Sequence, residues 1–220
     1  MSSGLGGKRF VASYSGGKDS VLAVYRAVNA GLRPMGLMTT YNMDSKRSWF
    51  HGMDEGVLQR AAESMGMPLT LIRTSGASYA ESFESALLEA KAGGAEVCVF
   101  GDIDIEGHLD WCSERCVNTG LVPFFPLLGA QRRDVAYEFA DAGFSAIIKT
   151  VDTSRLPGSV LGRIISRGVL DEIESSGADI CGENGEYHTF VFDGPLFSRT
   201  VPFEVKETVD WETYKILHIV

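Results

Sequence analysis

Cysteine is scarce in this sequence of 220 residues, and it never occurs as a C-x-x-C pair. Structural zinc sites and iron–sulfur clusters usually need thiols at such short spacings, so the sequence argues against both. The cysteines, at positions 98, 112, 116 and 181, are therefore predicted to be free and buried. Free thiols indicate a reducing, cytoplasmic compartment.

Long apolar runs and a basic stripe are also missing. No stretch of about 18 apolar residues occurs, so we expect no membrane-spanning segment. The opening residues, MSSGLGG, lack the apolar core of a secretory signal. The net charge of −9 argues against a nucleic-acid partner, because proteins that grip many phosphates usually carry a basic stripe. We expect a globular monomer or homodimer.

The most informative stretch that is present is SGGKDS, which lies between two apolar runs, FVASY and VLAVY. This order predicts a strand, a glycine turn and the start of a helix, where backbone N–H groups favour an anion. Adjacent glycines let the main chain approach a ligand closely. The predicted phosphate site consists of Ser15, Gly16, Gly17, Lys18, Asp19 and Ser20.

The hexapeptide is not a Walker A motif, which is longer and has Ser or Thr where this chain has Asp19. It resembles the pyrophosphate loop of the N-type ATP pyrophosphatases, the PP-loop superfamily. That resemblance implies cleavage of ATP to AMP and pyrophosphate with Mg²⁺ as a cofactor. Lys18 and Asp19 would then take part in catalysis, and Asp19 would hold the Mg²⁺ or orient the loop.

Strand-like and helix-like segments alternate up to about residue 125. Strands are expected at 10–14, 34–40, 68–73, 97–100 and 121–125, with helices between them. The alternation predicts an α/β fold with a doubly wound, mainly parallel sheet, whose ligands bind at the carboxyl edge. Gly101, Asp102 and His51 fall at that edge. Asp102 is either a ligand or a helix N-cap, and His51 either contacts the nucleotide or is merely packed or exposed.

The pattern changes beyond about residue 126. We expect a helix at 131–142, a strand at 144–151 and one or two helices over 160–174, interrupted near Gly168. Antiparallel strands are expected at 187–192, 201–208 and 214–220. The predicted division is a PP-loop ATP-binding domain at 1–128 and a smaller α+β domain at 129–220, on the substrate side.

A second polar stretch, CGENGEYHT, occupies 181–189. Asn184-Gly185 is a tight-turn signal, so a hairpin with a charged rim is one interpretation. The density of Glu183, Glu186 and His188 favours another, a site that holds ammonia, positions a carboxylate or transfers a proton. The residues alone leave both interpretations open.

With Phe50-His51, Gly101-Asp102-Ile103 and Leu161-Gly162-Arg163, these two stretches resemble the diphthine–ammonia ligase family over nearly the whole chain. The resemblance implies an adenine nucleotide α-hydrolase-like N-terminal domain. It implies that ATP and ammonium convert a carboxylate of diphthine, on elongation factor 2, into an amide. Glu183, Glu186 and His188 become candidates for the acceptor and ammonia site, and Arg163 for an anion.

A carboxylate needs activation because it is a poor electrophile. Its attack on the α-phosphate of ATP would give an acyl-adenylate, from which ammonia displaces AMP. The loop N–H groups, Lys18 and Mg²⁺ would stabilise the departing pyrophosphate. Two alternatives stay open: a PP-loop ATP pyrophosphatase that acts on another carboxylate or a tRNA base, and a nucleotide-binding regulatory module without turnover.

Overall fold

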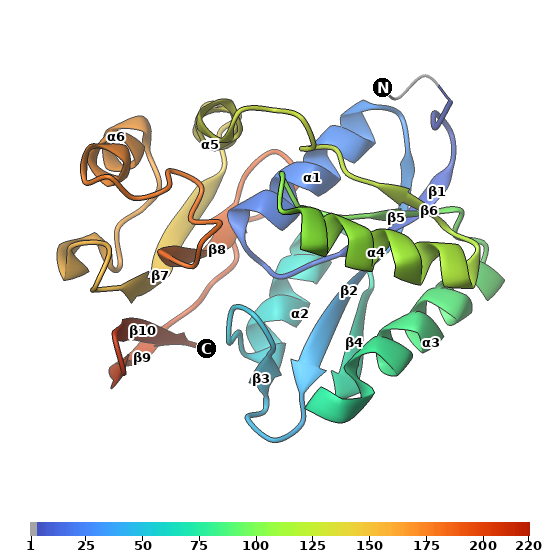
Figure 1. The fold of residues 1–220 in the computed structure, drawn as a ribbon, viewed down its shortest axis with the longest axis horizontal. Helices are drawn as coiled ribbons and strands as arrows, with labels where there is room; N and C mark the ends of the chain where they lie inside the picture. The colour runs from blue at the N-terminus through green and yellow to red at the C-terminus, as the bar shows by residue number, and fades with distance from the viewer. Residues whose placement is uncertain (1–3) are drawn as a thin grey trace.

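Two β-sheets organise the computed structural model, which describes residues 4–220 (Figure 1). Sheet A contains β1 (Arg9–Ser13), β2 (Arg33–Asn42), β3 (Arg47–Ser48), β4 (Leu69–Thr74), β5 (Val97–Val99) and β6 (Val122–Phe124). Sheet B contains β7 (Ser145–Asp152), β8 (Tyr187–Asp193), β9 (Val205–Trp211) and β10 (Tyr214–Ile219). The helices are α1 (Lys18–Asn29), α2 (Glu55–Ser64), α3 (Tyr79–Ala92), α4 (Glu106–Thr119), α5 (Arg132–Asp141) and α6 (Arg167–Ser175).

Sheet A has a parallel core in the order β4-β2-β1-β5-β6, and β3 forms a short antiparallel hairpin with the end of β2. The chain builds outward from β1 on one side and then crosses to the other, so the strand order reverses between β1 and β5. Ligands bind beyond the carboxyl ends of the strands at such a switch point. SGGKDS follows β1 and Gly101-Asp102 follows β5. The predicted doubly wound, mainly parallel α/β fold is confirmed.

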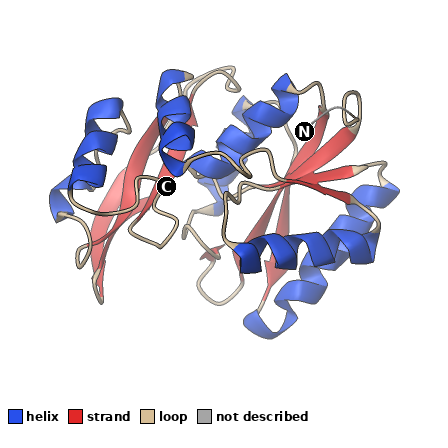
Figure 2. Cartoon of the chain, turned by 45° about the horizontal axis from the view of Figure 1, so that its top comes forward, coloured by secondary structure: helices blue, strands red, loops and turns tan. Residues whose placement is uncertain are grey.

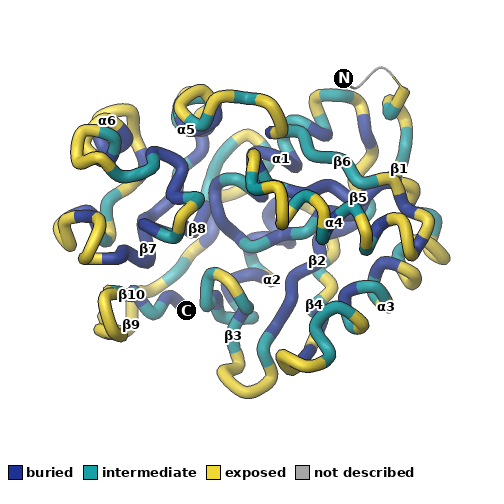
Figure 3. Tube along the Cα trace, in the orientation of Figure 1, coloured by how far each residue is buried: buried dark blue, intermediate teal, exposed yellow. Residues whose placement is uncertain are grey.

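Both faces of sheet A are covered, because successive side chains of a strand point to opposite faces. In β1, Phe10 and Ala12 belong to a hydrophobic cluster with α1 and α2. Val11, between them, belongs to a second cluster with α3 and α4. Buried residues concentrate along the central strands and α1 (Figure 3).

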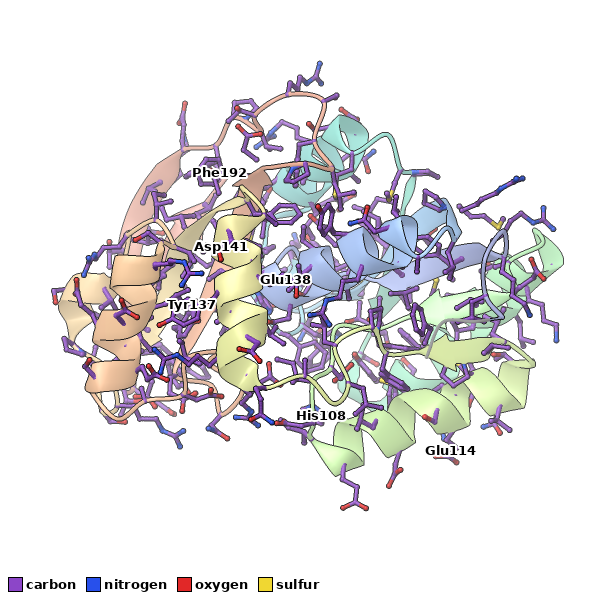
Figure 4. The ribbon with its side chains drawn as sticks, turned by 90° about the horizontal axis from the view of Figure 1, so that it is seen from above. His108, Glu114, Tyr137, Glu138, Asp141 and Phe192 are labelled. Atoms are coloured by element: carbon purple, nitrogen blue, oxygen red, sulfur yellow. The ribbon has the colours of Figure 1, made fainter. Side chains whose placement is uncertain are left out.

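Sheet B is antiparallel in the order β8-β7-β10-β9. Ile148 of β7 and Phe190 of β8 join the same cluster as α1, so α1 lies between the two sheets (Figure 2). An ion pair reinforces the contact, because Glu138 on α5 faces α1 and accepts a hydrogen bond from Arg26 Nε at 2.9 Å (Figure 4). One hydrophobic cluster therefore continues across the predicted boundary between residues 128 and 129, which itself stays a prediction.

Two segments differ from the sequence-based expectation. Over 160–174 the chain forms only a 3₁₀ turn, Gly158–Val160, and an extended stretch before α6 begins at Arg167. Gly162 is left-handed (φ +78°), which ends the turn, and Ser166 Oγ caps α6 by accepting the Val169 N–H at 3.3 Å. The helix break thus comes before Gly168.

The other difference is the strand expected at 201–208, which begins only at Val205. Pro202 lies in the lost part and has no N–H for a strand ladder. Its carbonyl instead accepts a hydrogen bond from Arg60 Nε at 3.3 Å, on α2.

The cysteine prediction is confirmed, since all four thiols are free and buried. Within residues 4–220, no helix combines the length and the apolar character needed to cross a membrane.

Gly101 packs against the first turn of α1 so closely that no side chain fits. A Cβ there would lie 2.8 Å from Ser20 N and 2.9 Å from the carbonyl carbon of Asp19. We expect Gly101→Ala to lower the free energy of unfolding by about 1–3 kcal/mol, as overpacking does. Gly107→Ala is the matched control, because a Cβ at that α4 position meets nothing within 4 Å. Urea denaturation compares the two variants, and equal stability would contradict the packing argument.

Candidate active site

A cavity of about 550 Å³ lies at the carboxyl edge of sheet A. Its lining comes from the loops after β1, β3 and β5 and the loop that precedes β8, together with parts of β2, β8, α1, α3 and α4. It brings together most of the residues that the sequence singled out: Ser15, Lys18, Asp19, Ser20, His51, Gly101, Asp102, Glu183 and His188. The two polar motifs, about 165 residues apart in the chain, therefore face one space.

Strand β8 holds the backbone of the PP-loop. The Val191 N–H donates to the Gly16 carbonyl at 2.9 Å, and the Lys18 N–H donates to Thr189 Oγ1 at 3.0 Å. Gly16 is left-handed (φ +82°), a conformation that glycine adopts without strain. At Gly17, a Cβ would lie 2.3 Å from His51 Cε1, so the missing side chain lets His51 lie against the loop.

The serines of the loop hydrogen-bond to one another. Ser15 Oγ lies 3.1 Å from Ser20 Oγ and accepts the Gly17 N–H at 3.2 Å. Helix α1 begins at Lys18 without a side-chain cap. Its first turn therefore combines a formed loop with N–H groups suited to an anion.

Lys18 is only 3% exposed, so it belongs to the packed site and not to the surface. Its Nζ donates to both carboxylate oxygens of Asp19, at 2.8 and 2.7 Å, and to the carbonyl of Cys181. Burial favours the neutral amine, but Asp19, Tyr187 and Cys181 together outweigh it and raise the pKa of Lys18 well above its usual range. Lys18 thus keeps a positive charge at the phosphate site.

Glu183 is the carboxyl group that titrates near neutral pH. Burial and the nearby Asp19 carboxylate raise the pKa of Glu183 to about 7. Burial also raises the pKa of Asp102, and Asp19 adds to that effect. A carboxyl with a pKa near 7 can both accept and return a proton at physiological pH.

His51 and His188 lie with their ring centres 4.7 Å apart. Burial, assisted by Lys149 and Lys18, lowers the pKa of His188 to about 4. Burial and the neighbouring His188 lower the pKa of His51 well below its usual range. Both rings are therefore neutral at physiological pH and act as hydrogen-bonding groups, with His51 Nδ1 3.1 Å from the Thr189 carbonyl.

Four of the candidate residues lie outside the cavity lining: Gly16 and Gly17 of the loop, Glu186 and Arg163. Glu186 is 4% exposed and accepts hydrogen bonds from the Asn184 N–H and Nδ2, both at 3.1 Å. It therefore braces the turn that carries Glu183. Arg163 forms an ion pair with Glu172 of α6.

Arg132 is a residue whose position the sequence analysis missed. Its guanidinium binds Asp104 at 2.8 and 2.6 Å and also binds Asp179. Asp179 in turn accepts the N–H groups of Cys181 and Glu183, both at 3.0 Å. Arg132 thereby ties the loop after β5 to the loop that carries Glu183. Arg132 is followed by Arg133, and such a pair is common on helix surfaces, so no motif marked it.

Lys149 was also missed. It lies at an irregularity in β7, where Ile148 pairs with Thr189 but Thr150 pairs with His188. Bulges of this kind redirect side chains near functional sites. Lys149 is 1% exposed, and its Nζ donates to the His51 carbonyl at 2.6 Å. Burial lowers the pKa of Lys149 to about 8.

The acidic groups of the cavity fit a magnesium ion carried by a nucleotide. Residues 4–220 contain no group of three or more His, Cys, Asp or Glu side chains arranged to hold a metal ion. Mg²⁺ commonly binds through one or two carboxylates together with substrate phosphates and water. Asp19 and Glu183 face the same space, and Asp19 contributes to the raised pKa of Glu183, so a cation held by Asp19 would relieve the repulsion between the two carboxylates.

Glu183→Gln should change stability only where Glu183 ionises. The folded chain keeps the proton to about pH 7, above the ordinary glutamate pKa, so stability falls as pH rises through that window. The glutamine variant cannot ionise and should be more stable by roughly 3 kcal/mol at pH 8, with little difference at pH 4. Urea denaturation at both pH values measures this, with exposed Glu89→Gln of α3 as the control. A pH-independent difference would contradict the argument.

Comparisons with known proteins cover both halves of the chain. The model of the diphthamide synthase N-terminal domain matches residues 8–123, and that of the diphthamide synthase C-terminal domain matches residues 131–220. A diphthine–ammonia ligase of Danio rerio is 27% identical, covering 91% of this chain and 88% of its own length. Its counterpart from Homo sapiens is 25% identical, covering 91% and 85%.

One solved structure similar to this chain is that of a predicted subunit of a tRNA methyltransferase from Methanocaldococcus jannaschii DSM. It matches 86% of this chain and 98% of its own with 14% identity and a TM-score of 0.46, a likeness too weak to inform function. The family expected from the motifs, and its ligase class, are confirmed by the other matches. Since the two family models together span nearly the whole sequence, the chain belongs to the diphthamide synthase family.

Proposed function

We propose that the chain uses ATP and ammonium to convert the carboxylate of diphthine, on elongation factor 2, into an amide. The observation that supports this most is the meeting of the PP-loop and the Glu183–Thr189 stretch in one cavity. The first supplies an anion site and the second supplies a proton acceptor. In this proposal residues 1–128 bind ATP, while residues 129–220 complete the site and face the acceptor.

The first step would be adenylation. The carboxylate oxygen attacks the α-phosphorus of ATP. The bond between the α-phosphorus and the oxygen that links it to the β-phosphorus breaks, and pyrophosphate leaves. Lys18 and the N–H groups at the start of α1 stabilise the charge that develops on the leaving group, in a buried setting where such contacts are strong. A magnesium ion held by Asp19 together with the nucleotide phosphates would supply further charge neutralisation.

The second step would be attack of ammonia on the acyl carbon, with loss of AMP. Ammonium must first lose a proton, and the attacking nitrogen must lose another as the amide forms. Glu183, with its pKa near 7, can accept a proton. The neutral rings of His51 and His188 can accept hydrogen bonds from the nitrogen without repelling ammonium. Arg132, through Asp179, holds the Glu183 backbone in place.

Product analysis tests the reaction. The protein is incubated with Mg-ATP, ammonium and elongation factor 2 that carries diphthine. We expect AMP and pyrophosphate, formed only when both the factor and ammonium are present. AMP formation with a different carboxylate or with a tRNA would support ATP cleavage at the PP-loop but would show that diphthine is not the acceptor. Bound ATP with no turnover under any condition would instead favour a regulatory module.

Glu183→Gln separates the second step from nucleotide binding. We expect the rate of amide formation to fall about 10²–10⁴-fold, the range typical of a lost general base. The affinity for ATP should change little, because Lys18 and the loop are intact. The wild-type rate should rise with pH through about 7, where Glu183 ionises.

Ammonium also loses a proton as pH rises, which produces more of the nucleophile ammonia, so the pH profile needs a control. Hydroxylamine is largely unprotonated at neutral pH and can replace ammonia as the nucleophile. The rise near pH 7 should persist with hydroxylamine and disappear in the glutamine variant. If the wild-type profile became flat with hydroxylamine, Glu183 would not be the group that accepts the proton.

A further inference from the structure

Part of the cavity is lined by aromatic rings that the proposed reaction does not use. This aromatic wall consists of Trp49, Phe50, Tyr79, Phe83, Phe100 and Trp111. The rings come from the loop after β3, from helices α3 and α4, and from the end of β5. Phe50 is 68% exposed, so its ring is accessible to a ligand.

The rings meet at steep angles. Trp49 and Phe50 each stand at 89° to Tyr79, with centres 5.7 and 6.3 Å from it. Trp111 is tilted by 47° to Tyr79 and by 52° to Phe83. A planar base such as adenine stacks best between parallel faces, which these pairs do not offer. Rings in several orientations suit a rounded group that touches more than one of them.

The charge around the aromatic wall is negative. Asp102 lies beside the wall, with Oδ1 3.5 Å from Nδ1 of His108 and Oδ2 3.9 Å from Sγ of Cys112. His108 lies at the start of α4 (Figure 4). Asp19 and Glu183 line the same cavity. Among the cavity's described lining residues, Lys18 alone carries a permanent positive charge, and Asp19 already pairs with it. The aromatic side of the cavity therefore favours a cation.

We propose that the aromatic wall, together with Asp102, binds a quaternary ammonium group of the acceptor substrate. Such a group has no N–H, so it cannot form hydrogen-bonded ion pairs, and ring faces with a nearby carboxylate are the partners that stabilise it. That this group belongs to the acceptor substrate rests on the proposed function. Holding that cation at the wall keeps the carboxylate in the cavity that contains Lys18.

Choline and its neutral isostere, 3,3-dimethylbutan-1-ol, test the proposal directly. The two probes have nearly the same shape and differ in charge. Isothermal titration calorimetry of the full chain, without nucleotide, should show choline binding at least tenfold more tightly, a difference of about 1.4 kcal/mol. Equal binding of the two would mean a merely apolar pocket, and no binding of choline would also overturn the proposal.

Variants locate the binding site. Phe50→Ala changes an exposed ring, so the variant should fold normally, and Asp102→Asn removes only the charge. Each should weaken choline binding about three- to tenfold. Trp211→Leu is the matched control, because this tryptophan of β9 is 61% exposed and lies outside the cavity lining. Unchanged choline binding in both Phe50→Ala and Asp102→Asn would contradict the assignment.

Adenine is the competing occupant, and one measurement separates the two. The affinity of Phe50→Ala for Mg-ATP should equal that of the wild type, and adenosine should not displace choline. Displacement by adenosine, or parallel loss of ATP and choline binding, would make the aromatic wall an adenine site. Choline binding needs no turnover, so it succeeds or fails independently of whether the chain forms AMP.

Discussion

Two hydrogen bonds from β8 to the PP-loop determine how the rest of the site is arranged. The loop follows β1 of sheet A, yet its backbone is bonded to Val191 and Thr189 of sheet B. The Thr189 carbonyl also contacts His51, which packs on Gly17. A motif usually attributed to the nucleotide half thus takes its shape from the half that carries Glu183.

Charge burial is the second constraint. Lys18, Asp19 and Glu183 are brought out of water together, and each changes the proton affinity of its neighbours. Lys18 stays charged because it is paired, whereas Glu183 has no comparable partner and titrates near pH 7. A single lysine against several carboxylates suits a site that receives both a polyanion and cations.

The sequence predicted the parallel sheet because five apolar strands alternate with helices, a pattern that depends on local residues alone. It also singled out SGGKDS and Glu183, which occur in compact motifs and which the structure brings to one cavity. Of the one or two helices predicted over 160–174, only α6 forms, because a left-handed Gly162 and a cap at Ser166 outweigh the apolar spacing of the first part. The sequence could not predict the roles of Arg132, Lys149 and the aromatic wall, because each depends on contacts with residues distant in sequence. Burial of Lys18 was missed for the same reason, because Cys181 and Tyr187 cover it from the far half of the chain.

The hydrophobic cluster that continues from sheet A through α1 into sheet B has a consequence for how the molecule loses its structure. If either sheet separated from α1, apolar surface of both that sheet and α1 would be exposed to water. We therefore expect heating to melt the chain in one cooperative transition, with no intermediate in which only one half is folded. Chimeras that join halves from distant relatives would have to exchange the surface of α1 together with sheet B.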